Sequence, residues 1–213
     1  RLAFADRAQY LGDPDFVSPP AGGWVGLLGP AYLAERAKLI AQGPNEPSMK
    51  TAKPGLPAGA KIVYAPMAEQ VEYGTSHVSI VDGKGHSVAM TSTIEDAFGA
   101  RQMVQSTPGL AGGFLLNNEL TDFSFTPRDG NGNPIANRVE PGKRPRSSMA
   151  PTMVFDKATG DLLISAGSSG GPLIIHFVGK TIYGLLHWGL TPQESIALPS
   201  FASLNGPSVL EEK

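Results

Sequence analysis

The stretch "GTSHVSIVDGKGHSVAMTST", residues 74–93, decides how the chain is expected to fold. Residues 77–82 and 86–93 have the composition of strands, and the glycine-containing turn 83–85 between them predicts a β-hairpin. The first strand opens with a glycine, two hydroxyl side chains and an imidazole in a row. These residue types are compatible with a nucleophile, and equally with an ordinary entrance to a strand.

Further strands and helices are predicted on both sides of this hairpin. Strands are expected at 112–118, 151–156 and 161–168, with a second hairpin turn at 157–160. Helices are expected at 2–12, 30–43, 170–189 and 191–198, the last with Thr191 as N-cap. Strands followed by packed helices predict a layered α+β fold.

Composition excludes several classes of function. With 213 residues, 41% of them hydrophobic, the chain is long and apolar enough for a substantial core. The formal net charge of -2 offers no basic excess for nucleic acid or an anionic membrane surface. The absence of cysteine removes thiolate catalysis and sulfur-bound metals. Lys180 interrupts the longest apolar run, 172–190, so we expect no membrane span.

Without cysteine, a nucleophile must be a hydroxyl with a base. Of the four histidines, His176 and His187 lie in an apolar helical pattern typical of packing residues, and His86 adjoins a turn and is expected to be solvated. His77 could share a face of its strand with Thr75. A serine–histidine hydrolase using His77 therefore stays open, although no G-x-S-x-G motif supports it.

A threonine can also be activated as the first residue of a chain, where its own α-amine is the base. The Gly74–Thr75 bond is suited to such a cleavage, because glycine permits a strained backbone and close approach by the Thr75 hydroxyl. A plain strand entrance is the alternative.

Three other groups have residue types that could bind or activate a substrate. The loop 167–171, "GSSGG", follows a strand and opens a helix, where backbone N–H groups can stabilise an anion. Ser147 and Ser148 follow a basic run, and they could instead form a solvated turn. Glu119 and Asp122 could grip an ammonium group or lie in an exposed loop.

Four stretches stand out in order along the chain. They are "TSHVSIVDGKGHSVAMTSTIEDAFG" at 75–99, "GGFLLNNELTDFS" at 112–124, "KRPRSSMAPTMV" at 143–154 and "SAGSSGGPLII" at 165–175. Together they resemble the γ-glutamyltranspeptidase family, threonine members of the N-terminal nucleophile hydrolases. The resemblance implies an αββα sandwich, here in part.

The resemblance implies that the precursor cleaves itself between Gly74 and Thr75. Residues 1–74 would then be the C-terminal segment of the large subunit, and 75–213 the small catalytic subunit, truncated at its C-terminal end. Thr75 would be the nucleophile and Thr93 would orient it.

The other site residues follow from the same resemblance. Gly170 and Gly171 would supply the N–H groups of the oxyanion hole. Ser147 and Ser148 would hold the α-carboxylate of a γ-glutamyl group. The carboxylates that would hold its α-amine are Glu95, Glu119 and Asp122, with Glu95 standing where many members have asparagine.

The expected substrates are γ-glutamyl compounds such as glutathione, with water or an amino acid or peptide as acceptor. No cofactor is implied. The remainder of the large subunit is an expected partner, and the resemblance alone favours a periplasmic or extracellular location. Two alternatives within the family stay open: an acylase for glutaryl or cephalosporin-type amides, and a catalytically silent, uncleaved homologue.

Overall fold

The computed structural model describes residues 1–41, 43, 48–70, 74–105, 107–109 and 111–212, and it divides into two compact units. The first unit consists of residues 1–70, 120–146 and 203–207. The second contains the described residues of 71–119, 147–202 and 208–213. Each unit thus combines segments that are far apart in the sequence.

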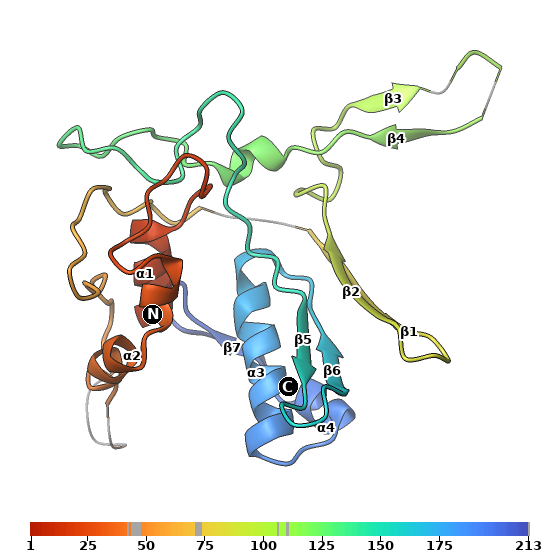
Figure 1. The fold of residues 1–213 in the computed structure, drawn as a ribbon. Helices are drawn as coiled ribbons and strands as arrows, with labels where there is room; N and C mark the ends of the chain where they lie inside the picture. Colours follow the sequence, from red (N-terminus) through yellow and green to blue (C-terminus); the bar gives the residue numbers. More distant parts are fainter. Residues whose placement is uncertain (42, 44–47, 71–73, 106, 110, 213) are drawn as a thin grey trace. The chain divides into compact units, whose positions relative to one another are not determined.

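The first unit begins with three short helical elements (Figure 1). They are α1 Leu2–Tyr10, the 3₁₀ helix η1 Trp24–Leu28, and α2 Pro30–Ala37. Pro30 opens α2 because its fixed φ suits the first helical position. The helix ends at Ala37, short of the predicted end at Gly43. Leu39 and Ile40 are exposed, so another turn would have buried no apolar face.

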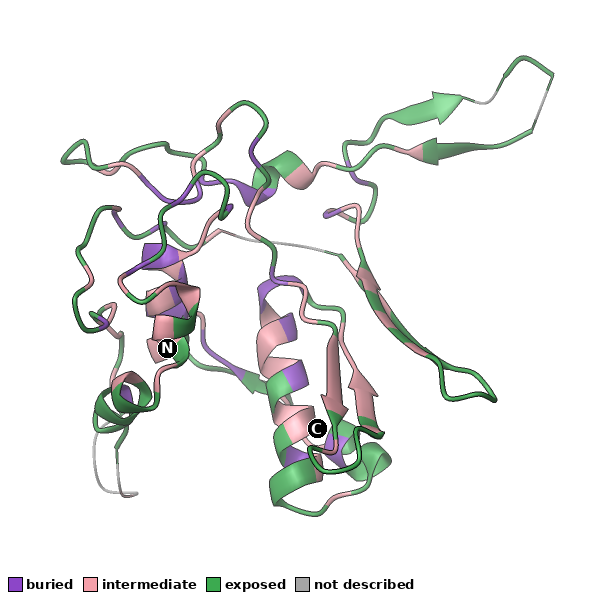
Figure 2. Cartoon of the chain, viewed as in Figure 1, coloured by how far each residue is buried: buried purple, intermediate pink, exposed green. Residues whose placement is uncertain are grey.

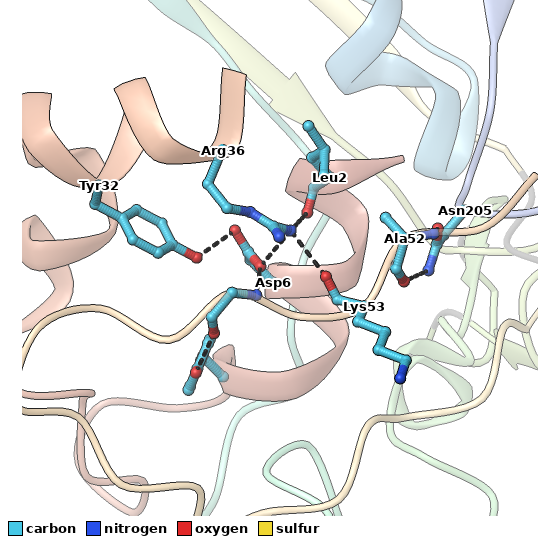
Figure 3. A network of polar contacts seen from close by, with 9 residues as sticks. Leu2, Asp6, Tyr32, Arg36, Ala52, Lys53 and Asn205 are labelled. Atoms are coloured by element: carbon cyan, nitrogen blue, oxygen red, sulfur yellow. Dashed lines mark hydrogen bonds and ion pairs between the residues drawn. The ribbon is translucent and has the colours of Figure 1, made fainter. Parts of the chain in front are cut away.

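Asp6 on α1 connects the two α-helices through its carboxylate (Figure 3). Its Oδ2 accepts a hydrogen bond from the Tyr32 hydroxyl at 2.8 Å, and its Oδ1 accepts from Arg36 Nη2 at 2.9 Å and Gly55 N at 2.7 Å. Arg36 also donates to the Leu2 carbonyl at 3.0 Å. Burial and the Asp6 carboxylate raise the pKa of Tyr32, which keeps that hydroxyl a donor.

The core of the first unit joins segments from both sides of residue 74. Ala65, Met67 and Ile135 form a buried apolar cluster. Asn137 is fully buried, and its Nδ2 donates to the Asp122 carbonyl at 2.7 Å. Buried amides must be hydrogen-bonded to be tolerated, so this pairing fixes the path of residues 120–146.

The second unit contains the hairpin predicted from the sequence. β1 Ser76–Val81 pairs antiparallel with β2 Ser87–Ser92, with Ser76 opposite Ser92. In the turn, Asp82 Oδ1 accepts from Lys84 N at 2.8 Å and His86 N at 2.9 Å. The predicted turn chemistry is therefore confirmed.

The other strands also form two-stranded antiparallel sheets. β3 Met103–Gln105 pairs with β4 Gly113–Leu115, β5 Thr152–Phe155 with β6 Leu162–Ala166, and β7 Phe201–Ala202 with β8 Val209–Leu210. The 3₁₀ helix η2 Glu119–Asp122 follows β4. Sequence patterns predicted β4, β5 and β6 but not β3, β7 or β8.

Strand β6 packs against the first hairpin. Ser165 Oγ donates to Ser79 Oγ at 3.2 Å, and a Cβ added to Gly167 would overlap the His77 ring. Neither β1 nor β2 carries a buried residue, as Figure 2 shows by its colours. Since an isolated two-stranded hairpin is only marginally stable in water, the contact with β6 is important for holding it.

The second unit also holds the helices predicted near the C-terminal end. The helix predicted at 170–189 is divided into the 3₁₀ helix η3 Gly171–Leu173 and α3 Ile174–His187, and the helix predicted at 191–198 is α4 Pro192–Ala197. Ser195 is fully buried between the two α-helices, and its Oγ donates to the Thr181 carbonyl at 3.0 Å. A Cβ on Gly184 would overlap Ser195, so glycine is what lets α3 and α4 approach each other. Among the described residues, no helix is both long and apolar enough to cross a membrane.

Candidate active site

Gly74 lies at the mouth of β1 in a backbone conformation that favours glycine. Its φ is +61°, and a Cβ added there would lie 2.6 Å from the Glu95 carbonyl oxygen. Any L side chain would be strained and would collide with backbone. The bond after Gly74 is thus held by a glycine that other residues cannot easily replace.

The Thr75 hydroxyl faces the carbonyl group of the residue before it. Thr75 Oγ1 donates to the Gly74 carbonyl oxygen. Thr93 Oγ1 reaches the same oxygen through a long hydrogen bond of 3.4 Å. The two hydroxyls meet because Ser76 pairs with Ser92, which puts Thr75 and Thr93 opposite each other just past the end of the ladder.

A second contact orients the Thr93 hydroxyl. Its oxygen accepts a hydrogen bond from Glu95 N at 2.8 Å, which occupies a lone pair and directs the proton elsewhere. Gly74 O is the acceptor in reach. The sequence placed Thr93 on the second strand, whereas β2 ends one residue earlier, at Ser92.

A cleft of about 320 Å³ opens beside these hydroxyls. It is lined by Gly74, Thr75, Ser76, Ser92, Thr93, Ile94, Asp96 and Ala97, all from the second unit. The volume is at the lower end of the range typical of small-molecule sites.

Glu95 lies between two residues that line the cleft. It is 5% exposed and has a φ of +72°, which is unusual for a residue other than glycine. Asn118 Nδ2 donates to Glu95 Oε2, and Asn118 Oδ1 accepts from Asp96 N at 2.9 Å. Sequence reasoning missed Asn118. Asn117 and Asn118, which follow β4, could have indicated this role. An asparagine side chain can donate to a carboxylate and accept from a backbone N–H at the same time.

Glu119 and Asp122 occupy the two ends of η2. Glu119 belongs to the second unit, with Thr75, and Asp122 belongs to the first. Asp122 is 7% exposed. Glu119 therefore lies in the same unit as the cleft, whereas Asp122 belongs to the other unit.

The two tandem serines differ in burial. Ser148 is 5% exposed, whereas Ser147 is exposed and its Oγ accepts from Met149 N at 3.1 Å. That bond is the local turn considered from the sequence. Both serines belong to the second unit and precede β5.

Gly170 and Gly171 have positive φ values, +124° and +53°. A Cβ on Gly170 would lie 2.8 Å from Phe177 Cε2, so glycine is favoured there by both conformation and space. The loop that holds them starts at Gly167, against His77 of β1, and ends in η3. The first residue of the loop thus contacts β1 at His77, two residues after Thr75, and Gly170 and Gly171 come three and four residues later in the loop.

The comparison with family models covers almost the whole chain. Residues 1–212 match the model described as "Gamma-glutamyltranspeptidase". The chain belongs to the γ-glutamyltranspeptidase family.

Individual relatives agree with this membership. The glutathione hydrolase proenzyme of Bacillus subtilis (strain 168) is 38% identical over 204 residues, which cover 93% of this chain and 32% of the relative. The chain thus spans about a third of that relative's length. The "Putative inactive glutathione hydrolase 4" of Arabidopsis thaliana is 37% identical over 133 residues, 60% of this chain and 66% of the relative.

A solved structure supports the expected fold. The γ-glutamyltranspeptidase from Pseudomonas nitroreducens, complexed with L-DON, is 33% identical with a TM-score of 0.51, over 60% of this chain and 64% of that one. The mixture of helices and antiparallel strands agrees with it. The expected α+β fold of the N-terminal nucleophile hydrolase type is confirmed.

His77 and His187 of this γ-glutamyltranspeptidase chain have local partners. His77 Nδ1 lies 2.8 Å from Thr91 Oγ1, and its Nε2 lies 3.0 Å from Ser79 Oγ. Both nitrogens are therefore engaged along the hairpin, which argues against His77 as a base for Thr75. His187 is exposed and stacks on Tyr183, with ring centroids 4.4 Å apart, so the prediction that it packs in a core was wrong.

Proposed function

We propose that this chain contains the catalytic segment of a self-processing γ-glutamyl amide hydrolase and transferase, with Thr75 as nucleophile. The observation that carries the proposal is the pair of hydroxyls, from Thr75 and Thr93, on the Gly74 carbonyl oxygen. A nucleophile beside its target carbonyl, with a second hydroxyl to polarise that carbonyl, suits an intramolecular acyl shift.

Self-cleavage would proceed in two steps. The Thr75 oxygen bonds to the Gly74 carbonyl carbon, and the Gly74–Thr75 carbon–nitrogen bond breaks. The hydroxyl proton ends on the released nitrogen, which leaves an ester. Water then hydrolyses the ester, giving a Gly74 carboxylate and a Thr75 with a free α-amine and a free hydroxyl. Residues 1–74 and 75–213 would become parts of separate subunits.

The free α-amine would then serve as the base for substrate turnover. Thr75 Oγ1 attacks a γ-glutamyl amide, the amine takes the hydroxyl proton and gives it to the leaving amine, and a γ-glutamyl ester forms. The backbone N–H groups of Gly170 and Gly171 would stabilise the oxyanion. Water or an acceptor amine releases the ester, as hydrolysis or transfer.

The substrate would be held by groups of opposite character. Ser147 and Ser148 would donate to its α-carboxylate, and Glu95, Glu119 and Asp122 would accept from its α-ammonium group. The Bacillus subtilis relative is a glutathione hydrolase proenzyme, which supports glutathione as a substrate and cleavage of a precursor.

A silent, uncleaved homologue is the second candidate. The "Putative inactive glutathione hydrolase 4" of Arabidopsis thaliana is 37% identical to this chain over 133 residues. The Bacillus subtilis proenzyme is 38% identical over 204 residues, so the two identities are nearly equal. Identity at this level therefore does not separate active from inactive members.

An assay of the full-length protein on a γ-glutamyl anilide and a glutaryl anilide separates these possibilities. We expect faster cleavage of the γ-glutamyl compound, ping-pong kinetics with an acceptor dipeptide, and loss of both activities in Thr75→Ala. Faster cleavage of the glutaryl compound would refute the substrate assignment. A full-length protein that stays uncleaved and acts on neither compound would favour the silent, uncleaved homologue.

A further inference from the structure

The first unit is built across the bond that the proposed function cuts. Residues 1–70 lie on one side of Gly74–Thr75, and residues 120–146 and 203–207 lie on the other. In an intact chain their contacts are intramolecular. After cleavage the same contacts would have to hold two separate chains together, without the high effective concentration that a covalent link provides.

Asp13 makes three hydrogen bonds with Arg144, which lies on the other side of the Gly74–Thr75 bond. Its carboxylate accepts from Arg144 Nε at 2.9 Å, Nη2 at 2.6 Å and backbone N at 2.8 Å. The Asp13 side chain is 1% exposed. Arg144 Nη2 also donates to Asp15 Oδ2 at 2.6 Å. A paired arginine and carboxylate of this geometry is strong and directional, and a buried carboxylate left without its partner is costly.

Elsewhere in the first unit, hydrogen bonds between uncharged groups also join residues before Gly74 to residues after Thr75. Asn205 pairs with both backbone groups of Ala52: Oδ1 accepts from the N–H at 2.6 Å, and Nδ2 donates to the carbonyl at 2.9 Å. Gln70 Nε2 donates to the Phe123 carbonyl at 3.0 Å, and Gln70 Oε1 accepts from Phe125 N at 2.9 Å. These bonds fix register, whereas Asp13 and Arg144 supply the opposite charges.

The fit around the ion pair is close. A Cβ on Gly12 would lie 2.8 Å from the Ala136 carbonyl oxygen, and Val17 is 1% exposed. The backbone just before Asp13 is therefore packed against Ala136, which lies beyond the cleavage bond. The Asp13 carboxylate is shielded from water, while the Arg144 side chain is 66% exposed and covers it from the solvent side.

We propose that the Asp13–Arg144 ion pair is the anchor by which the segment ending at Gly74 stays bound to the chain that begins at Thr75. The partner that this surface fits is thus the other product of the same precursor. The inference rests on the proposed cleavage. It assigns an intersubunit role to two residues outside the catalytic machinery.

The test measures how firmly the two products of the full-length, self-cleaved protein stay together. One product carries an affinity tag, and the retained fraction of the other is followed through a urea series. We expect Asp13→Ala and Arg144→Ala each to increase dissociation about tenfold or more, and the double variant to be no worse than the worse single variant. Arg144→Lys, which keeps the charge but loses the paired geometry, should be intermediate.

In each of two control contacts, both partners belong to the same cleavage product. Arg128 Nη1 donates to the Gly132 carbonyl at 2.8 Å, and Glu35 pairs with Lys38, each within one product. Arg128→Ala and Glu35→Ala should dissociate like the unchanged protein. The same Asp13 and Arg144 substitutions in the uncleavable Thr75→Ala protein should leave the chain folded by circular dichroism, because the covalent link remains.

A second arm separates this proposal from the proposed function. The Thr75→Ala protein receives a recognition sequence for a specific protease between Gln70 and Gly74, and it is cut externally. If the unchanged protein never cuts itself but the external products depend on Asp13, the proposed function fails and the anchor stands. If the products stay together equally well with Asp13→Ala, the anchor is refuted, whichever way they were cut.

Discussion

The hydroxyl of Thr93 takes part in two hydrogen bonds with different roles. It accepts from Glu95 N at 2.8 Å and donates to the Gly74 carbonyl at 3.4 Å. The first bond fixes the direction of the second, because a hydroxyl whose lone pair is engaged has less freedom to rotate. Thr93 is thus placed to polarise the carbonyl that Thr75 would attack.

Replacing Thr93 tests this role. Thr93→Val keeps the shape and removes the hydroxyl, so we expect self-cleavage of the full-length protein to slow by about 100-fold or more, as for loss of a donor to a developing oxyanion. Thr93→Ser keeps the hydroxyl and should cleave within about tenfold of the unchanged protein. The fraction of intact chain is followed by gel densitometry. Equal rates for Val and Ser would contradict the role.

At the residue scale, the family resemblance predicted that Thr75 and Thr93 act together, and the hydroxyls of both contact the Gly74 carbonyl oxygen. Their catalytic roles stay predictions, and the loop beside them was not predicted. Thr75 and Thr93 come together because strand register follows from hairpin pairing, which a sequence pattern can predict. The φ of +72° at Glu95 could not be predicted, because a residue other than glycine seldom adopts it without support from its surroundings. Asn118 supplies that support from a distant segment.

At the scale of elements, local signals worked where they were strong. The turn 83–85 and the cap at Thr191 are both as predicted. Strand β3 was missed because its three residues, Met103–Gln105, are all exposed and show no alternation. The end of α2 was misplaced because helix propensity continues to Gly43, while burial does not.

The cap of α4 gives a stability prediction at this scale. Thr191 Oγ1 accepts from Glu194 N at 3.3 Å, and Glu194 Oε2 accepts from Thr191 N at 2.8 Å. Thr191→Ala should lower the free energy of unfolding by about 1 kcal/mol, whereas Thr191→Ser should keep most of it. Urea unfolding followed by circular dichroism measures both. An unchanged midpoint for Thr191→Ala would show that the cap does not stabilise the fold.

At the scale of the molecule, the predicted subunit boundary at Gly74–Thr75 does not coincide with the boundaries of the two compact units. Residues 120–146 and 203–207 join residues 1–70 through bonds such as Asn205 to Ala52, which are 153 residues apart. No periodicity or turn signal encodes a contact at that separation. The subunit boundary at Gly74–Thr75 stays a prediction.

Acid sensitivity is the prediction at this scale. Hydrogen bonds from the Arg144 side chain, and then from the backbone N–H groups of Arg144 and Asp15, hold the pKa of Asp13 well below its ordinary value of 3.8. Arg144 is the charged group that lowers it, and Arg144 in turn pairs with Asp15. A depressed folded pKa means that this stabilisation is present above 3.8 and is lost as the pH falls through the lower folded pKa.

The cleaved products should therefore come apart more readily as the pH is lowered below 3.8, the ordinary value for aspartate. In Asp13→Asn they should already be looser at pH 7, and the change on acidification should be shallower. Size-exclusion chromatography over a pH series reports both. Parallel pH curves for the two proteins would contradict a role for the Asp13 carboxylate.

The central claim is that Thr75 cuts the bond before it and becomes an amino terminus. Intact-mass spectrometry of the purified full-length protein tests it most directly, with Thr75→Ala, Thr75→Ser and Ser76→Ala alongside. We predict two fragments for the unchanged protein and for Ser76→Ala, one of them beginning at Thr75, slower formation of the same pair for Thr75→Ser, and a single intact chain for Thr75→Ala. Cleavage of Thr75→Ala at the same bond, or a persistent intact chain in the unchanged protein, would contradict the account.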